Sequence, residues 1–309
     1  MAKTKTEAAK PKATEPEATE PKAGSALVEA ADGTVSAELM ALAEEDGPED
    51  QERSAEDILI PRLNILQALS PQVQKQKGEY IPEAEVGMIY DGIQHLYDGE
   101  AGVLLVPISY RRAIIEWTKR EDGGGFVKDH SLDFDIATQC LRETGPEKFR
   151  DVVLDEKGVP GKTHVVMAAE FLCFIVDKAT GVFAPAMVSM TVTQMKKAKQ
   201  WNSIIDTYRA PATGGGTFNP KSYFNAYRLT TVPESNRRGQ DYMGWKVARE
   251  LQTFNLPNGS AIYEAARDFR ASVESGEIKV KPAESNADTS EDGGGSGFTP
   301  AEDDTKDKM

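Results

Sequence analysis

Five β-rich runs and a single amphipathic segment limit the folds open to this chain more than any other feature. The runs cover residues 103–117, 163–177, 181–192, 223–232 and 241–251, and β-branched or aromatic side chains recur in each of them. The amphipathic segment, residues 193–208, stands between the third and fourth runs. Its apolar side chains recur every three or four positions, as on one face of a helix. They are Met195, Ala198, Trp201, Ile204, Ile205 and Tyr208.

This order of elements is that of the OB-fold, a five-stranded, partly open barrel that binds oligonucleotides and oligosaccharides. The turn at residues 177–181 is short and polar and ends in glycine. We therefore expect the second and third runs to be antiparallel neighbours. The sequence predicts a mixed β fold with one main helix and an OB-like barrel. Other α+β domains produce the same order, so this alternative stays open.

The two ends of the chain differ from its centre in composition. Residues 1–56 are rich in Ala, Glu, Lys, Thr and Pro, and residues 271–309 have few aromatic or β-branched side chains. Such segments bury too little apolar surface to offset their ordering entropy. We predict a disordered, acidic and Pro-rich arm at 1–56, a folded core at 57–270 with an insert at 121–162, and a disordered acidic tail at 271–309.

Cysteine content and hydropathy indicate the compartment. Cys140 and Cys173 are the only cysteines, which is no disulfide framework and suggests a reducing environment. No apolar run approaches the roughly 18 residues of a membrane span, and no apolar stretch follows the basic N-terminus. We expect a cytoplasmic protein with no membrane partner, in the host cell cytoplasm if a phage encodes it.

Positive charge gathers in the centre of this acidic chain. The formal net charge is -14, yet residues 191–250 hold ten Lys and Arg against four Asp and Glu. Tyr223 and Tyr227 fall on one face of the fourth run, and Tyr242 and Lys246 share a face of the fifth. Single-stranded nucleic acid binds such surfaces, because bases stack on flat rings at roughly 1–3 kcal/mol each while Lys and Arg contact the phosphates.

We therefore predict a nucleic-acid-binding groove from these strands, the end of the first run and the amphipathic helix. Its candidate residues are Arg111, Arg112, Trp117, Lys119, Arg120, Lys196, Lys197, Lys199, Lys221, Tyr223, Tyr227, Arg228, Arg237, Arg238, Tyr242 and Lys246. Alternatively, the helix lysines are only its solvated face; Trp201 and Tyr208 are expected in the core. The loops DGGGFV and ATGGGTF are either fingers that close over a strand or ordinary surface loops.

Several short segments of the core resemble a protein of tailed-phage replication regions. They are IPRLNILQALSP, GGGF after a strand that ends in EW, and TQMKKAKQWNSII followed by YRLTTVPESN. The resemblance covers roughly residues 57–250. It implies a single-stranded DNA-binding or replication-accessory role.

The C-terminal sequence resembles the acidic tails of bacterial and phage single-stranded DNA-binding proteins, because a glycine-rich spacer precedes the acidic residues 302–304. The resemblance implies that the tail competes with DNA for the basic groove and recruits replication proteins. The tip, residues 306–309, replaces the usual acidic and aromatic ending with KDKM, which puts docking through the tip in doubt. A merely solubilising tail is the alternative.

The sequence lacks the motifs of common catalytic sites. His95, His130 and His164 are the only histidines, and they and the cysteines show no zinc-ligand spacing. No phosphate-binding loop or nucleophile elbow occurs. Asp133 and Asp135 lie in the polar insert, where solvated charges are the expected interpretation. We expect no metal, no cofactor and no enzymatic activity.

The sequence thus favours sequence-tolerant binding of single-stranded DNA in phage replication or recombination, with the acidic tail for regulation or partner contact. The alternative is a virion structural or assembly protein whose β-rich core makes protein–protein contacts. A recombination mediator that also binds single strands is a third candidate. The oligomeric state stays open.

Overall fold

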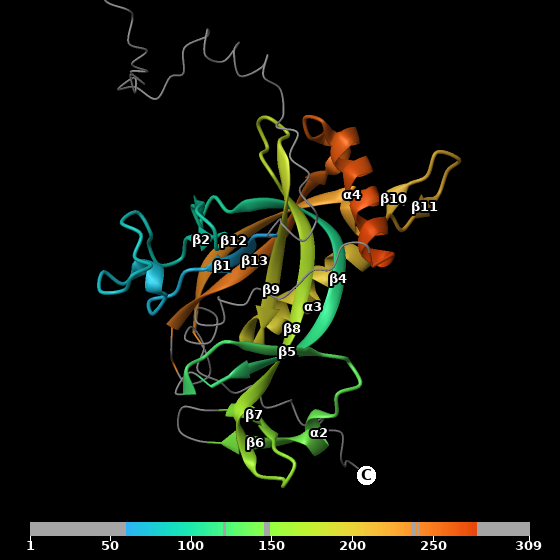
Figure 1. The fold of residues 1–309 in the computed structure, drawn as a ribbon. Helices are drawn as coiled ribbons and strands as arrows, with labels where there is room; N and C mark the ends of the chain where they lie inside the picture. The colour runs from blue at the N-terminus through green and yellow to red at the C-terminus, as the bar shows by residue number, and fades with distance from the viewer. Residues whose placement is uncertain (1–59, 120–121, 145–148, 236–238, 240, 277–309) are drawn as a thin grey trace, which may run out of the picture. The chain divides into compact units, whose positions relative to one another are not determined.

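The computed structural model describes residues 60–276 apart from 120–121, 145–148, 236–238 and 240. The predicted arm at 1–56 and most of the predicted tail at 271–309 lie outside these residues. Within the described part of the chain, an 11-stranded sheet and a separate two-stranded hairpin accompany a few helices (Figure 1). The prediction of a mostly β protein with few helices is confirmed.

The elements follow the chain in this order. The strands of the sheet are β1 (Arg62–Ile65), β2 (Ile89–Tyr90), β3 (Leu96–Tyr97), β4 (Val103–Thr118), β5 (Phe126–His130), β6 (Cys140–Thr144), β7 (Phe149–Leu154), β8 (Pro160–Val176), β9 (Phe183–Thr191), β12 (Asn225–Ser235) and β13 (Asp241–Gln252). The separate hairpin is formed by β10 (Ala210–Pro211) and β11 (Thr217–Phe218). The helices are α2 (Ile136–Gln139), α3 (Met195–Thr207) and α4 (Gly259–Glu274), with short 3-10 helices η1 (Pro71–Val73), η3 (Val192–Gln194), η4 (Ser222–Phe224) and η5 (Thr253–Asn255).

β4 and β8 form the spine of the sheet. They pair antiparallel over most of their length, ending with Thr118 opposite Thr163. The register shifts between Pro107 and Ser109, since a proline has no N–H to donate to the ladder and strands accommodate it at bulges. β12 and β9 flank one half of this spine, and β5 and β7 flank the other half (Figure 1).

The five predicted runs correspond to β4, β8, β9, β12 and β13, which lie in the sheet in the order β13-β12-β4-β8-β9. The order β12-β4-β8-β9 is that of a Greek key. The predicted hairpin is confirmed, because β8 and β9 pair antiparallel up to Val176 opposite Phe183. The insert predicted at 121–162 supplies β5, α2, β6, β7 and the start of β8. The boundary predicted at residue 270 falls within α4.

The predicted five-stranded OB-like barrel is not confirmed. Its closure requires the third run to meet the fifth, but β9 pairs in parallel with β1 from the N-terminal part of the core. The sheet path then continues through β2 to β3, and the sheet does not close. These three strands are only two to four residues long, too short to show an alternating pattern.

At the start of β4 both faces of the spine are buried, each in a different hydrophobic cluster. Successive side chains of a strand point to opposite faces. Val103 and Leu105 accordingly belong to the cluster that contains Trp201 of α3, whereas Leu104 and Val106 belong to the cluster that contains α4. A strand that is buried on both faces reads as a continuous apolar run, which explains the start of β4.

Aromatic contacts connect the two helices to the sheet. Trp201 is fully buried, as predicted, and stacks on Phe171 with ring centroids 4.1 Å apart. Tyr227 meets Trp201 edge-on at 5.8 Å. On the other face, Phe269 of α4 lies 5.7 Å from Phe174. Aromatic pairs of this kind contribute about 0.5–1.5 kcal/mol beyond their buried area, so α3 and α4 are fixed to opposite faces of the same strands.

Side-chain amides cover the outer edge of β13. The Gln67 amide nitrogen donates to the Met243 carbonyl at 2.8 Å, and the Met243 N–H donates to the Gln67 Oε1 at 2.9 Å. The Trp245 N–H donates to Oε1 of Gln194 at 3.0 Å. A glutamine amide carries the same donor and acceptor as a peptide group. Gln67 therefore takes the place of a partner strand at this edge.

Replacing Gln67 with methionine tests this edge. The substitution keeps the length of the side chain but leaves both polar groups of Met243 without their partner. We expect a loss of about 1–3 kcal/mol in the free energy of unfolding, measured by urea denaturation. Gln74→Met is the matched control, because the Gln74 amide makes only a long 3.4 Å contact with the Ala68 carbonyl. Equal stability of the two variants would contradict a structural role for the Gln67 amide.

Candidate nucleic-acid interface

The predicted tyrosines of the fourth and fifth runs do not form an exposed aromatic face. Tyr227 is fully buried, and burial raises its pKa to about 12. Tyr223 lies on η4, is 5% exposed and packs against Tyr263 of α4. Tyr242 is half-buried, and its hydroxyl donates to Glu234 at 3.0 Å. The alternating pattern placed these rings on a groove, but the gain from burying apolar ring surface directs Tyr227 into the core instead.

Several predicted basic residues form ion pairs with carboxylates. Arg111 contacts Glu170 at 2.6 Å and Asp129 at 2.8 Å. Lys197 contacts Glu234 at 2.5 Å. These pairs neutralise positive charge that a formal count assigns to the surface, so Arg111 and Lys197 contribute little to an attractive field for phosphates.

Arg228 forms the third such pair. Its guanidinium contacts Glu250 through Nε at 2.6 Å, and Lys178 contacts the same carboxylate at 2.7 Å. The hydrogen bond from Arg228 lowers the pKa of Glu250 from its ordinary value of 4.5 to about 2, against the opposing effect of burial. This carboxylate is therefore held in its charged form between two cations.

The remaining predicted residues are spread over several elements. Arg112, Lys196, Lys199, Lys221 and Lys246 are exposed on β4, α3, the segment before η4, and β13. Their contribution to binding stays a prediction.

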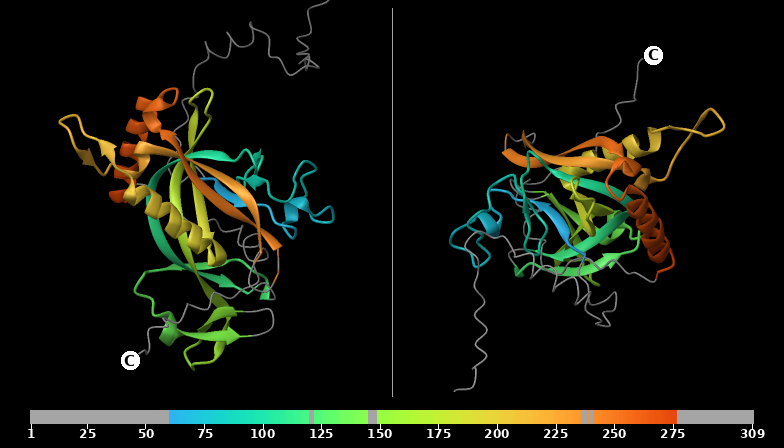
Figure 2. Two further views of the ribbon diagram at one scale, coloured as in Figure 1. Left: turned by 180° about the vertical axis from the view of Figure 1, so that it is seen from behind. Right: turned by 90° about the horizontal axis from the view of Figure 1, so that it is seen from above.

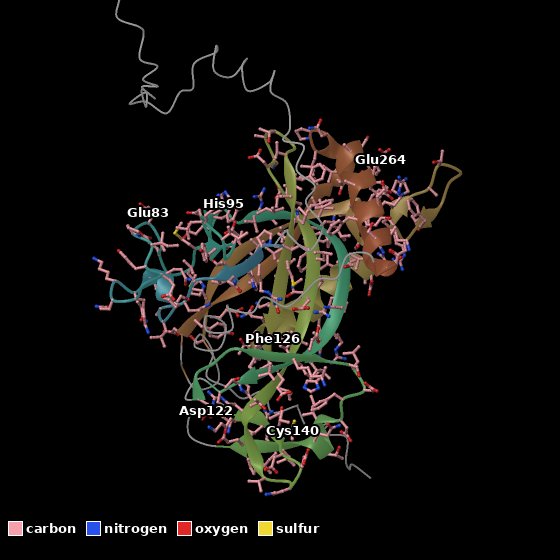
Figure 3. All side chains as sticks on the ribbon, in the orientation of Figure 1. Glu83, His95, Asp122, Phe126, Cys140 and Glu264 are labelled. Atoms are coloured by element: carbon pink, nitrogen blue, oxygen red, sulfur yellow. The ribbon has the colours of Figure 1, made fainter. Side chains whose placement is uncertain are left out.

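Trp117 and Lys119 are half-buried. The Trp117 ring meets Phe126 edge-on at 5.7 Å, in the part of the sheet opposite the end that carries α4 and Glu264 (Figure 3). Arg120, Arg237 and Arg238 lie outside the described residues.

A different set of rings comes together beside α4. We call it the aromatic row, and it consists of Phe218 on β11, Phe224 and Tyr223 on η4, Phe254 on η5, Tyr263 on α4, and Tyr208 at the end of α3. Adjacent ring centroids are 6.1 Å apart for Phe218 and Phe224, 5.8 Å for Phe224 and Phe254, 4.6 Å for Phe254 and Tyr263, 4.9 Å for Tyr263 and Tyr223, and 6.0 Å for Tyr208 and Phe224. The row is thus continuous from one end to the other.

Contacts to backbone carbonyl groups bring the elements of the aromatic row together. The Thr253 hydroxyl donates to the Tyr223 carbonyl at 2.7 Å, in a fully buried position that joins η5 to η4. Gly259 begins α4 directly against η5, where a Cβ would collide with the Thr253 carbonyl oxygen. Only glycine fits at this close approach. The rings of η4, η5 and α4 are therefore held by the fold rather than by loose loops.

The outer rings of the aromatic row are exposed, and the inner rings support them. Phe218 is 45% exposed and Phe254 is 46% exposed, whereas Phe224 is half-buried and Tyr223 is almost fully buried. The β10-β11 hairpin that carries Phe218 extends away from the sheet next to α4 (Figures 1 and 2). Supported rings with free faces are suited to stacking with a planar ligand.

Basic side chains without carboxylate partners border the aromatic row. Arg209, Lys221 and Arg249 are exposed, and within the described residues none of them forms an ion pair. Arg209 donates to the carbonyls of Asp206 and Tyr208 at the end of α3, at 2.7 and 2.9 Å. Positive charge therefore remains at this site, in contrast to the neutralised pairs described above.

Of the residues predicted from the sequence, only Lys221 and Tyr223 belong to the aromatic row or to the basic residues that border it. Phe218 had one signal, its place at the end of the glycine-rich ATGGGTF loop. Tyr208 was expected in the core but is half-buried. Phe254 and Tyr263 follow the last of the five runs, outside the strand faces from which the groove was predicted.

A second possible site is a cavity of about 370 Å³ beside the C-terminal end of α4, lined by Ser109, Tyr110, Arg111, Glu170, Leu172, Met187, Arg270, Val273 and Glu274. Its charged groups pair with one another or with neighbours: Arg111 with Glu170, and Arg270 with Glu274. No three metal-ligating side chains gather in the described part of the chain. Nor is any helix described there long and apolar enough to span a membrane.

One known protein family matches most of the chain. The family profile of the Pam3 phage gp34-like proteins matches residues 30–279, which is most of its length. The chain belongs to the Pam3 phage gp34-like family. It is therefore a bacteriophage protein, and the matched span includes the sheet, α3, α4 and the whole aromatic row. No curated protein and no solved structure matches it.

The Glu250 ion pair generates a pH-dependent prediction. Because its folded pKa lies below its ordinary value, the carboxylate stabilises the fold above pH 4.5, and this stabilisation is lost as the pH falls toward 2. We expect Glu250→Gln to cost about 1 kcal/mol at neutral pH. Urea unfolding should show the two proteins converging as the pH drops below 4.5. Glu264→Gln, at an exposed position on α4, is the control, and a constant difference across this range would contradict the assignment.

Proposed function

We propose that this phage protein binds single-stranded DNA and that the aromatic row is its binding surface. The observation that carries the proposal is the pair of exposed phenylalanines, Phe218 and Phe254, supported by inner rings and bordered by basic residues that form no ion pair in the described part of the chain. Bases stack on such rings at about 1–3 kcal/mol each, while Lys and Arg contact the phosphates. The site combines both requirements, which the groove predicted from the sequence does not.

The geometry favours a single strand over a duplex. A phenyl ring can stack only with a base whose face is free, and duplex bases already stack on one another. The outer rings lie on η5 and on a short hairpin, not on a helix or ribbon shaped for a major groove. Because every base has an aromatic face, the proposed binding is sequence-tolerant.

The proposed role is that of a non-enzymatic accessory protein in phage DNA replication or recombination. The order β12-β4-β8-β9 is that of a Greek key, the connectivity on which the oligonucleotide-binding OB-fold is also built, although here the sheet is open. The acidic tail, most of which lies outside the described residues, is proposed to contact replication proteins or to regulate DNA binding. These roles rest on the resemblance of the sequence to phage replication proteins.

A virion structural or assembly function is the competing proposal, because the same rings support it. Exposed aromatic side chains are frequent anchors of protein–protein interfaces. The two functions differ in their response to salt. Contacts to phosphates weaken steeply as salt rises, with a log–log slope of about -0.7 per contact for single strands. An interface made by apolar rings alone weakens little.

Replacing the outer rings with leucine tests the proposed function. We expect Phe218→Leu and Phe254→Leu each to weaken binding of a fluorescein-labelled oligothymidylate by about 5- to 150-fold, the equivalent of 1–3 kcal/mol per lost stack. Fluorescence anisotropy at low salt gives the dissociation constants, and a duplex of the same length should bind less tightly.

Tyr110→Leu is the matched control for these variants. Tyr110 is 42% exposed, close to the exposure of the two phenylalanines, but its ring packs on Phe171 and contacts no ring of the aromatic row. We expect its replacement to leave DNA affinity unchanged. The proposed function is wrong if the full chain fails to bind the oligonucleotide at low salt, or if all three variants behave alike.

A further inference from the structure

We propose that Arg249 is the phosphate anchor of the aromatic row and that Tyr208 positions it. This inference rests on the proposed function, since the ligand is a phosphodiester of single-stranded DNA. It gives the bound strand a defined direction across the site, with a phosphate at one end of the row and the bases at the other.

The side chains of Arg249 and the next residue, Glu250, lie on opposite faces of β13. The ladder between β12 and β13 shifts register here, because Ala226 pairs with Leu251 and Tyr227 pairs with Arg249. Irregularities of this kind are frequent beside functional sites, where they aim a side chain. Glu250 neutralises Arg228 on one face. Arg249 lies on the other face, at the end of α3.

Tyr208 holds the Arg249 guanidinium in place. The guanidinium carbon lies 4.9 Å from the centroid of the Tyr208 ring, within the range of a cation–π contact. The Tyr208 hydroxyl in turn accepts a hydrogen bond of 3.2 Å from the Gln252 amide. The ring thus orients the guanidinium without occupying its N–H donors.

The donors of Arg249 are available for an anion. Among the described residues, the Arg249 side chain has neither a carboxylate partner nor a hydrogen-bond acceptor. By contrast, Arg62 and Arg111 share Glu170, and Arg270 contacts Glu274. A planar, permanently charged guanidinium with free donors binds a phosphate through two parallel hydrogen bonds.

The neighbouring charges favour an anion at this position. Arg209 is exposed next to Tyr208, and its donation to the last carbonyls of α3 offsets the negative end of the helix. Asp206 is the opposing group on the last turn of α3, and it is exposed and forms no ion pair with Arg249. Removing the Asp206 charge should therefore strengthen DNA binding.

Phe224 connects the anchor to the stacking rings. It contacts Tyr208 at 6.0 Å, Phe218 at 6.1 Å and Phe254 at 5.8 Å. A phosphate on Arg249 and a base on an outer ring would thus lie on either side of the same inner ring. The arrangement suits a strand whose backbone follows the end of α3 while its bases turn toward α4.

The experiment measures the salt dependence of binding to fluorescein-labelled oligothymidylate with the full chain. We expect Arg249→Gln to reduce the magnitude of the log–log salt slope by about 0.7, the value of one phosphate contact, and to weaken low-salt binding about tenfold. Arg249→Lys should restore the slope but only part of the affinity, because an ammonium lacks the planar fork. Tyr208→Leu should keep the slope and weaken binding, and Asp206→Asn should tighten it.

Lys128→Gln is the matched control, because it removes an exposed positive charge from β5, at the other end of the sheet from α4 (Figure 1). We expect it to leave the slope unchanged. Equal slopes for Arg249→Gln and Lys128→Gln would overturn the anchor, even if the phenylalanine variants lose affinity as proposed. No binding by any form of the protein would instead overturn the proposed function. Urea unfolding of Arg249→Gln checks that the variant folds.

Discussion

The long antiparallel pairing of β4 with β8 is the constraint on which the rest of the structure depends. At the start of β4 both faces of this pair are buried, one against α3 and the other against α4. The apolar side chains that alternate there each belong to one of these two cores. Phe171 packs under Trp201, and Phe174 packs under Phe269. The rings of this part of the sheet are therefore not available to receive a base.

Charged side chains of the core are likewise paired with one another. Glu170 is almost fully buried, and a buried carboxylate is costly unless it is paired and hydrogen-bonded. Arg62 and Arg111 satisfy this requirement, and Arg228 and Lys178 do the same for Glu250. Much of the positive charge in the centre of the chain is thus neutralised within the protein, and it remains available on those described side chains, such as Arg249, that form no ion pair.

The proposed binding surface consequently forms near the ends of helices and strands. The aromatic row uses the residue that ends α3, the β10-β11 hairpin, two short 3-10 helices and the first turns of α4. These positions lie outside the alternation of the sheet. Tyr223 belongs to the α4 core, whereas the outer rings of Phe218 and Phe254 belong to neither core. Buried contacts such as that of Thr253 with Tyr223 hold them in place. Exposed rings lie there beside guanidinium groups that form no ion pair among the described residues, because the packing of the spine uses neither of them.

The sequence by itself determined the mostly β architecture, the antiparallel β8-β9 hairpin and α3 with its buried Trp201. These features are local, since side-chain periodicity and turn chemistry act between near neighbours in the chain. Tertiary structure decided whether Tyr227 faced solvent or core, which carboxylate each arginine met, and whether β9 met β13 or β1. It also decided that Phe218, Phe254 and Tyr263 share one surface. Such outcomes depend on contacts between residues far apart in the chain, and no periodicity encodes the partner of a side chain at that distance.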